Sequence, residues 1–517
     1  MAERLQVETP FSAPSFLNDE IYPLRWKAST VEGQPDISGL PSIDHAIYLF
    51  NTVKFHLGQN YQLIDETNFV KNLEEFYYGL ASKKAAESPL WFVQFLLVLS
   101  FGQAFLSRSK DSKEPPGAKF FVRAMALLPE PNALWKDSLL AIEVLALAGL
   151  YLYSIYQRES AQLYIAQAIR IAQLEGLHTQ LPEDALGTQA VARCRNLWWT
   201  LYIMDRHFSC SVGVPMNTQD ADITTVLDPP SICSQRDATL GLQVKLSRLL
   251  SSIITTIYRS EKTPLGEFLT STKSILHALA GHAQEIEKIT RFKFQNSVDA
   301  MPKGTRSITL LYHQVGLSAV GPFLRHSSRF QLTVKPPTEV FLPFELEYAY
   351  GAAIHLTMAK ALFPAIIGDD GLAQMEQTHN ILDDMISKGN LVAEVRKAEL
   401  VHLETLFREF TRRVRDQDFE DRIYSPARRL NGIPSGSIEA VIDPITTQAF
   451  VSEPDLVSMT TVSESQPLAS VLSDTPDNTE FLETIGISSD DFLSIVEQMG
   501  NENELPFSML DLGQFWK

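Results

Sequence analysis

Cysteine is the scarcest residue type in this chain of 517 residues. Its three cysteines, Cys194, Cys210 and Cys233, are too few for a disulfide framework and suit a reducing compartment. Cys194 and Cys210 are sixteen residues apart, and no second cysteine pair or histidine pair accompanies them, so the spacing of a zinc site is absent. We therefore expect this chain to bind no metal of its own and no other cofactor.

Signatures of secretion and of catalysis are also missing. The first residues contain no basic segment followed by an apolar one, so we expect no signal peptide. The sequence has no P-loop, no HExxH motif and no Rossmann fingerprint. Asp369-Asp370 and Asp383-Asp384 lack the third acid of the DDxxD motif of terpene synthases, and Gly316–Val320 lacks the last glycine of a GxSxG elbow. These absences predict a protein that is not an enzyme.

The alternation of polar and apolar residues that marks a strand is absent as well, and helical spacing replaces it from Pro41 onward. Two stretches, Pro89–Leu106 and Leu139–Tyr156, are apolar nearly all round. Gln94 interrupts the first and Glu143 the second, so we predict buried core helices and no contact with a membrane. Further helices are expected at Ala118–Leu128, Glu159–Glu175, Leu240–Thr263, Pro264–Phe292, Arg306–Phe323, Glu345–Pro364, Leu372–Lys388 and Leu391–Arg415.

Acidic residues gather at one end of the chain. The net charge is -18, and residues 431–517 hold 15 acidic residues and one basic residue. Such a polyanion repels nucleic acid, so this end is not expected to touch DNA. We predict an all-α protein with three parts: an irregular, proline-containing segment at 1–40, a large multi-helix domain at 41–425, and an acidic, disordered tail at 426–517.

Two adjacent tryptophans, Trp198 and Trp199, lie in the predicted helix Arg193–Ser209. Neighbouring residues of a helix point about 100° apart, so both indoles are buried only if this helix is central or lies in a corner between other helices. We expect it to lie at the centre of the core.

A charged pair, Asp205-Arg206, follows on the same helix. A buried charge needs a partner. We expect Arg206 to bind carboxylates or carbonyl oxygens of the next segment, such as Asp220 or Asp222, and Asp205 to accept hydrogen bonds from backbone amides or from another basic side chain. Core packing and loop anchoring are the favoured role of this motif, and contact with a ligand is the alternative.

Glycines border the motif on both sides. Gly176 is placed to end the preceding helix, because glycine tolerates the left-handed conformation of a C-terminal cap. We interpret His178 as a helix-end histidine rather than a metal ligand. Downstream, Gly213 and Pro215 break the chain. The helices at 138–156 and 159–175 are expected to form an antiparallel hairpin, with Ser138 capping the first of them.

The acidic tail contains apolar residues at helical spacing. In the segment 488–499 they fall at positions i, i+3, i+4 and i+7, which is typical of a short helix that docks in a groove. A second apolar cluster follows. Acidic residues mixed with bulky apolar ones are the composition of acidic activation domains, whereas packing of the tail on its own domain is the alternative. The predicted activation residues are Phe492, Ile495, Val496, Met499, Phe507, Leu510, Phe515 and Trp516.

The segment Arg193–Ile223, RCRNLWWTLYIMDRHFSCSVGVPMNTQDADI, together with the glycine-ended helix before it, resembles the fungal-specific transcription factor domain. This domain is the helical middle region of fungal zinc-cluster regulators. The likeness covers about residues 41–330 and weakens toward 420. Val214 and Gly321 stand where the family often has arginine, which puts a carried-over anion contact in doubt but not the fold. The resemblance implies a transcription regulator in the nucleus, with a helical domain that can sense a small molecule and a tail that binds coactivators.

Regulators of this type carry an N-terminal binuclear zinc cluster in which six cysteines hold two metal ions. The first cysteine here is Cys194, so we expect no such cluster in these 517 residues and zinc only in full-length family members. Three explanations stay open: a regulator that lacks a finger and works through partners, a truncated gene model, or a dimer with a finger-bearing relative.

DNA would then be contacted indirectly or through that partner, and the sequence leaves both a homodimer and a heterodimer open. We favour control of a secondary-metabolite gene cluster. A helical scaffold or adaptor without transcriptional activity is the alternative function.

Overall fold

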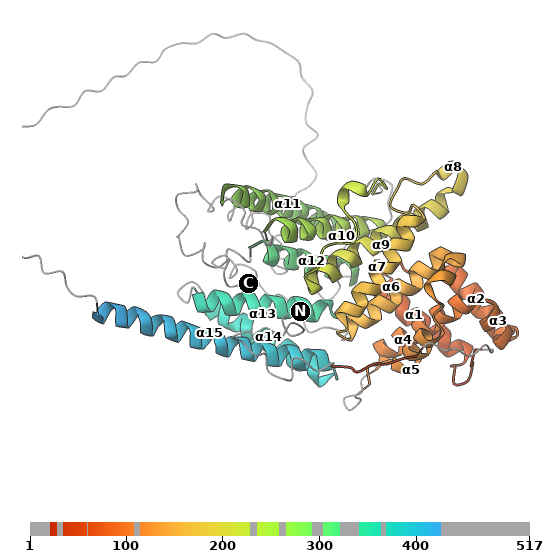
Figure 1. Cartoon of the computed structure of the whole chain (residues 1–517), viewed down its shortest axis with the longest axis horizontal. Coiled ribbons are helices and arrows are strands. Elements are labelled where there is room, and N and C mark those ends of the chain that lie inside the picture. The colour runs from red at the N-terminus through yellow and green to blue at the C-terminus, as the bar shows by residue number, and fades with distance from the viewer. Residues whose placement is uncertain are drawn as a thin grey trace, which may run out of the picture.

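The computed structural model describes residues 21–27, 35–58, 60–107, 114–227, 235–257, 265–291, 303–320, 341–362 and 369–424. Within these ranges the regular elements are all helices, with no strand among them, so the predicted all-α class is confirmed (Figure 1). The predicted acidic tail, its activation residues and much of the segment 1–40 lie outside the described residues.

The first part of the chain packs around two helices that are buried on nearly every side. These are α4 (Pro89–Leu106) and α6 (Ser138–Ser154), the two apolar stretches of the sequence. Within the described ranges α4 is long and apolar enough to cross a membrane, but 78% of it is buried against the rest of the protein. A helix that is apolar all round suits such a central position. Around this pair lie α1 (Ile43–Leu57), α2 (Glu66–Tyr78), α3 (Ala81–Glu87), α5 (Ala118–Leu127) and α7 (Arg158–Leu174).

The double-tryptophan segment forms α9 (Thr188–Val212), which is longer at both ends than the predicted helix Arg193–Ser209. A short helix, α8 (Glu183–Leu186), precedes it. On one side α9 packs against α7, and on another against α10 (Gln235–Ser252). Because α10 contributes to both apolar cores, α9 lies where the first core meets the second.

The second core is formed by α10, α11 (Leu265–Arg291), α12 (Lys303–Val320) and part of α13 (Phe344–Leu362). The sequence predicted one helix over Leu240–Thr263, but α10 gives way at Ile253 to a π-helical turn, Ile253–Ile257. The hydroxyls of Thr255 and Thr256 donate to the carbonyls of Ser251 and Ser252 there. Side-chain hydrogen bonds of this kind compete with the regular backbone ladder.

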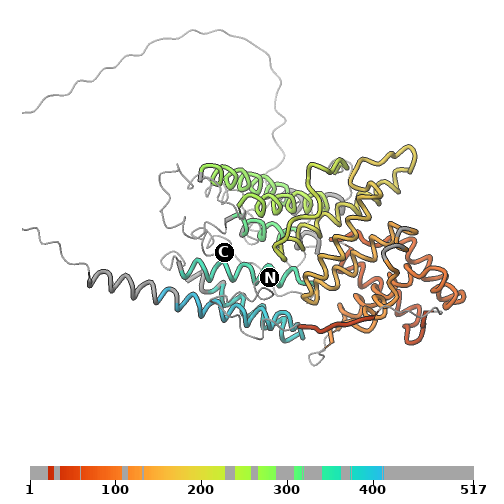
Figure 2. The backbone as a smooth tube through the Cα atoms, viewed as in Figure 1, coloured from red at the N-terminus to blue at the C-terminus, as the bar shows by residue number. Residues whose placement is uncertain are grey.

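The last two helices form a hairpin beside α13. They are α14 (Asp369–Ser387) and α15 (Leu391–Tyr424). The latter continues nine residues beyond the predicted end at Arg415. Figures 1 and 2 show α15 as a long rod along one edge of the molecule. Both α13 and α14 pack along it.

The ends of the helices agree with the sequence-based predictions at two glycines and differ from them at one serine. After α7, Gly176 has φ +75° and donates to Gln173 O, while Leu177 donates to Ala172 O, which is the predicted left-handed cap. Gly213 ends α9 in the same way. The prediction that Ser138 caps α6 was wrong. A 3-10 helix, Pro131–Asp137, runs directly into α6, so Ser138 already has helical angles and its side chain makes no cap.

Candidate functional site: the double-tryptophan helix and the junction beside it

Both indoles of the motif are buried, as predicted. Trp198 is 1% exposed and Trp199 is 2% exposed. The ring of Trp198 lies 5.6 Å from the ring of His178, and Trp199 meets Tyr202 edge-on at 5.3 Å. The Nε1 of Trp199 points to the carbonyl of Val226 at 3.5 Å. The two tryptophans therefore contact the turn that follows α7 and the loop that follows α9.

The guanidinium of Arg206 is buried and holds that loop. Its Nη2 donates to Asp220 Oδ1 and to the carbonyl of Thr218, both at 2.7 Å. Its Nη1 donates to Asp205 Oδ2 at 2.9 Å, and its plane lies 3.7 Å from the ring centre of Tyr202. The predicted contacts with a carboxylate and with carbonyl oxygen are confirmed. The carboxylate is that of Asp220; among the described residues Asp222 is not a partner of Arg206.

Asp205 binds the start of the same loop. It is fully buried and accepts from Asn217 twice, from the side-chain Nδ2 at 2.6 Å and from the backbone N–H at 3.2 Å. Ser209 Oγ also donates to it. Burial raises the pKa of Asp205 above its ordinary value, although these hydrogen bonds and Arg206 oppose the rise. The predicted backbone amide donor is thus present.

Further contacts fix the loop at its far end. The carbonyl of His178 accepts from the backbone N–H groups of Thr224 and Thr225 at 3.0 and 3.1 Å. Gln173 Nε2 donates to Thr218 Oγ1 at 3.0 Å. The helix-end turn at Gly176 and His178 therefore binds the loop that begins at Gly213 and Pro215. The residues of the motif together form a buried anchor for residues 213–227.

A second buried cluster was not predicted from the sequence. Its centre is Glu347 on α13, which accepts hydrogen bonds from Arg158 on α7 and from Arg396 on α15. Arg396 also pairs with Glu399 at 2.6 Å. Burial alone would raise the pKa of Glu347, but Arg396 and Arg158 outweigh it and hold the pKa below its ordinary value. These contacts join the first core to the hairpin α14–α15.

The ring of Tyr156 lies within this cluster. Arg158 and Arg396 stack on it at 4.5 and 4.7 Å from the ring centre. Tyr156 has φ +70° and ends α6 in the conformation that usually requires glycine. The neighbouring packing must offset this strain, which costs on the order of 1–3 kcal/mol.

His207 on α9 borders the junction. Its ring packs against Phe344 at 5.2 Å and Tyr153 at 5.6 Å, and its Nε2 has no hydrogen-bond partner among the described residues. Burial lowers the pKa of His207 to about 4. The ring is therefore neutral at pH 7.

Sequence reasoning missed this junction because its residues are far apart along the chain. Arg158, Glu347 and Arg396 come from three helices, and periodicity does not indicate which helices meet. One local signal was present: Glu347 stands between the apolar residues Leu346 and Tyr348. A charge on an apolar stretch of helix indicates a buried partner.

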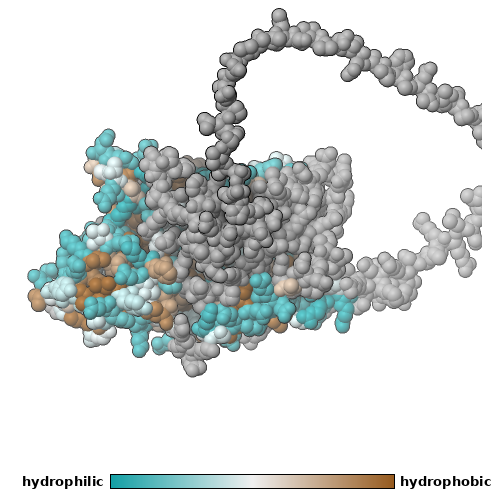
Figure 3. Space-filling model, turned by 180° about the vertical axis from the view of Figure 1, so that it is seen from behind, coloured by the Kyte–Doolittle hydropathy of each residue, from teal (hydrophilic) through white to brown (hydrophobic). Residues whose placement is uncertain are grey.

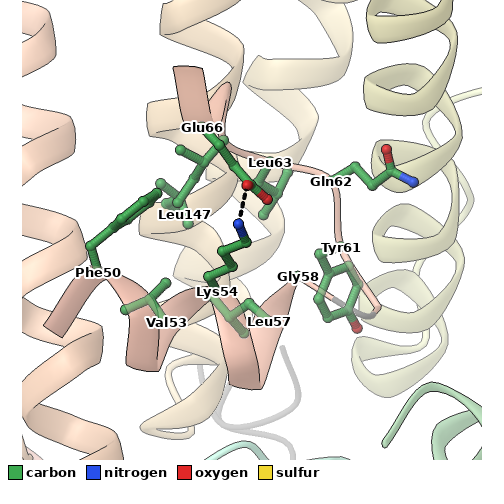
Figure 4. Close-up of a pocket in the computed structure, with 11 residues that line it drawn as sticks. Phe50, Val53, Lys54, Leu57, Gly58, Tyr61, Gln62, Leu63, Glu66 and Leu147 are labelled. Carbon is green, nitrogen blue, oxygen red and sulfur yellow. Dashed lines mark ion pairs between the residues drawn. The ribbon is translucent and has the colours of Figure 1, made fainter. Parts of the chain in front are cut away.

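Figure 4 shows a small pocket between α1, the segment that leads into α2, and α6. Its walls are mostly apolar, and an ion pair between Lys54 and Glu66 crosses one side. The volume is about 20 Å³, enough for about one water molecule. This pocket is therefore too small to hold a metabolite.

Comparison with known proteins shows which family this chain is similar to. The model of the family described as "Fungal specific transcription factor domain" matches residues 47–300, which include the helices of the first core, α9 and its anchored loop. The chain carries a fungal-specific transcription factor domain. The predicted resemblance is confirmed, and the family and the relatives are described as transcription regulators rather than enzymes.

Three relatives illustrate the likeness. An uncharacterised transcriptional regulatory protein of Schizosaccharomyces pombe is 24% identical over 198 residues, 38% of this chain and 25% of the relative. The sorbicillinoid biosynthetic cluster transcription factor 2 of Penicillium rubens is 26% identical over 215 residues, 40% of this chain and 31% of the relative. An ABC-transporter-regulating transcription factor of Aspergillus fumigatus is 25% identical over 197 residues, 37% of this chain and 22% of the relative.

The alignments thus span less than a third of the length of these relatives. No solved structure matches the chain.

Two of the three cysteines lie in the described part of the chain. Cys194 and Cys210 are free thiols on one helix, where Cys194 packs on the first core and Cys210 on the second. In the described part of the chain no group of three or more His, Cys, Asp or Glu residues is arranged to hold a metal ion.

Proposed function

We propose that this chain is a nuclear transcription regulator in which the helical domain is the regulatory part and the acidic tail recruits coactivators. The family domain at 47–300 supports the regulatory role. The tail sequence supports recruitment, because residues 431–517 carry 15 acidic residues and one basic residue while their apolar residues recur at helical spacing.

We further propose that the chain reaches DNA indirectly or through a finger-bearing partner, and that it holds no zinc or other cofactor itself. The three cysteines and their separation support this proposal. The excess of negative charge supports it too, since a chain of net charge -18 gains little from the phosphate backbone.

Control of a secondary-metabolite gene cluster is the proposed biological role. It is supported by the Penicillium relative, whose name assigns it to a biosynthetic cluster. Expression of genes beside the chain's own locus, compared between wild type and a deletion strain, tests this role.

The second core is the proposed place for a small-molecule effector. Along α10, Thr239, Gln243, Ser247 and Ser251 are buried at i, i+4, i+8 and i+12, so one stripe of the helix carries polar groups into an apolar interior. The Oε1 of Gln243 and the Oγ of Ser251 have no hydrogen-bond partner in the described part of the chain. Buried polar atoms are normally paired, so these two favour an effector that supplies hydrogen-bond donors.

A tethering experiment tests the activation function. The full chain and residues 475–517 alone are each fused to a neutral DNA-binding module that drives a reporter. We expect both fusions to activate, and we expect Phe492→Ala with Val496→Ala to lower the signal of each by about tenfold, since these residues belong to the apolar set at helical spacing in the sequence. The matched control is Gln498→Ala, a polar residue of the same segment that does not belong to this apolar set.

Reporter expression at background with both fusions would remove the activation function. The helical adaptor would then be the better description, because it binds partners without activating transcription.

A further inference from the structure

One side of the hairpin α14–α15 packs on the rest of the protein, and the other side is exposed to solvent. Leu400 and Ala393 of α15 are buried in the hydrophobic core. The α15 face, formed by Glu394, Lys397, Ala398, Val401, His402 and Thr405, lines a shallow groove bordered by Ile386 of α14. Val401 at its centre is 45% exposed. Figure 3 shows the lower edge of the molecule, where these helices run. The surface there is mostly hydrophilic, with scattered apolar residues.

Two opposite charges on this side of α15 lie at equal distances from Val401. Glu394 lies seven residues before Val401 and Arg408 lies seven residues after it, and both are exposed. Positions seven apart lie on the same side of a helix. Neither side chain has a hydrogen bond or an ion pair with any residue in the described ranges. Among the described residues, this side of α15 therefore carries an acid without a partner before Val401 and a base without a partner after it, whereas Lys397 is already paired with Asp383 of α14.

A surface of this kind is complementary to itself. Two copies of α15 lying antiparallel, with Val401 on the two-fold axis, would place Glu394 of each copy opposite Arg408 of the other. Each contact then occurs twice, as an isologous interface requires. We propose that the α15 face is the interface of a homodimer, in which the α14–α15 hairpins of two chains pack as an antiparallel four-helix bundle.

The arrangement favours a second copy over an unrelated partner because the chain itself supplies both halves of the charge pattern. Ala398 and Thr405 flank Val401 with small side chains, so two helix backbones can approach to the 8–10 Å that is usual for packed helices. The dimer is independent of the activation function, since the α15 face lies outside the tail.

Sedimentation equilibrium of the full chain, from about 1 to 100 µM, tests the interface. We expect a concentration-dependent dimer. Val401→Asp places two like charges on the two-fold axis and should weaken the dimer at least about tenfold. Leu163→Asp on α7 is the matched control, because Leu163 is an exposed apolar residue of another helix, 71% exposed, and its change should leave the dimer intact.

Charge reversal gives a second, more specific readout. Glu394→Arg and Arg408→Glu should each weaken the dimer several-fold, because each creates two repulsive pairs, and the double variant should restore it. Glu74→Arg on α2, another exposed acid, should have no effect. A monomer at every concentration would overturn the proposal. So would a dimer that withstands Val401→Asp, or a double reversal that remains as weak as the single variants.

Discussion

Single residues set how firmly the loop after α9 is held, and Arg206 contributes most of its contacts. Replacing Arg206 with methionine keeps the apolar stem but removes the hydrogen bonds to Thr218 and Asp220 and leaves Asp205 buried without its cation. We expect a loss of about 3–5 kcal/mol in the free energy of unfolding. Thermolysin should then cut the loop 213–227, which contains Ile223 and Val226, many times faster.

Arg248→Met is the control for that experiment. Arg248 contacts the same carboxylate at 3.4 Å but is half exposed, so its removal should cost at most about 1 kcal/mol. Equal cleavage of the two variants would show that burial of the Arg206 network does not hold the loop.

His207 is a residue whose protonation opposes folding. The unfolded chain binds a proton on this side chain near the ordinary pKa of about 6.5, whereas the folded protein keeps the ring neutral down to about pH 4. Protonation of His207 therefore does not affect stability above pH 6.5. As the pH decreases from about 6.5 to about 4, the free energy of unfolding falls by up to about 1.4 kcal/mol per pH unit. Urea unfolding at about pH 7, 6 and 5 should show a shallower fall for His207→Gln. Parallel curves for the two proteins would contradict this.

At the scale of whole elements, two glycine turns allow the cost of backbone conformation to be distinguished from the cost of steric overlap. Gly117 and Gly213 both have positive φ, +77° and +72°. A Cβ at Gly117 would lie 2.2 Å from the carbonyl oxygen of Ser100, whereas a Cβ at Gly213 would meet nothing within 4 Å. Gly213→Ala should cost about 1 kcal/mol from conformation alone. Gly117→Ala should cost at least twice as much, because α4 and the start of α5 must move apart; thermal unfolding measures both.

The elements themselves were largely predictable, whereas their ends and contacts were not. Apolar periodicity placed α4, α6 and α9 and put both tryptophans in the core. Serine is a common helix cap, so the sequence favours Ser138 in that role, but nothing in the sequence shows that the 3-10 helix before it already fixes its backbone. The anchor of Arg206 was predictable because Asp220 lies only fourteen residues away. Glu347 was not, since its partners are 189 and 49 residues distant.

At the scale of the whole molecule, the Glu347 cluster determines how the C-terminal hairpin sits on the first core. One carboxylate, buried on α13, pairs with arginines from α7 and α15, so a single side chain joins three helices from separate parts of the chain. A buried ion pair adds little stability over an apolar contact of the same size, but removing one partner leaves an uncompensated charge. The expected role of the cluster is therefore to select one arrangement of the hairpin.

Replacing Glu347 with glutamine tests that role. The change leaves Arg158 and Arg396 buried beside a neutral amide, so we expect a loss of about 3–5 kcal/mol. The loss should not be uniform: amide hydrogen exchange should rise in α13, α14 and α15 while α4 and α6 stay protected, because their apolar packing is untouched. Asp383→Asn is the control, since Asp383 is 54% exposed and pairs with Lys397 at the surface. If exchange rose equally in α4 and α6, the two cores would unfold as one unit, and the cluster would be a part of the common core rather than a separate joint.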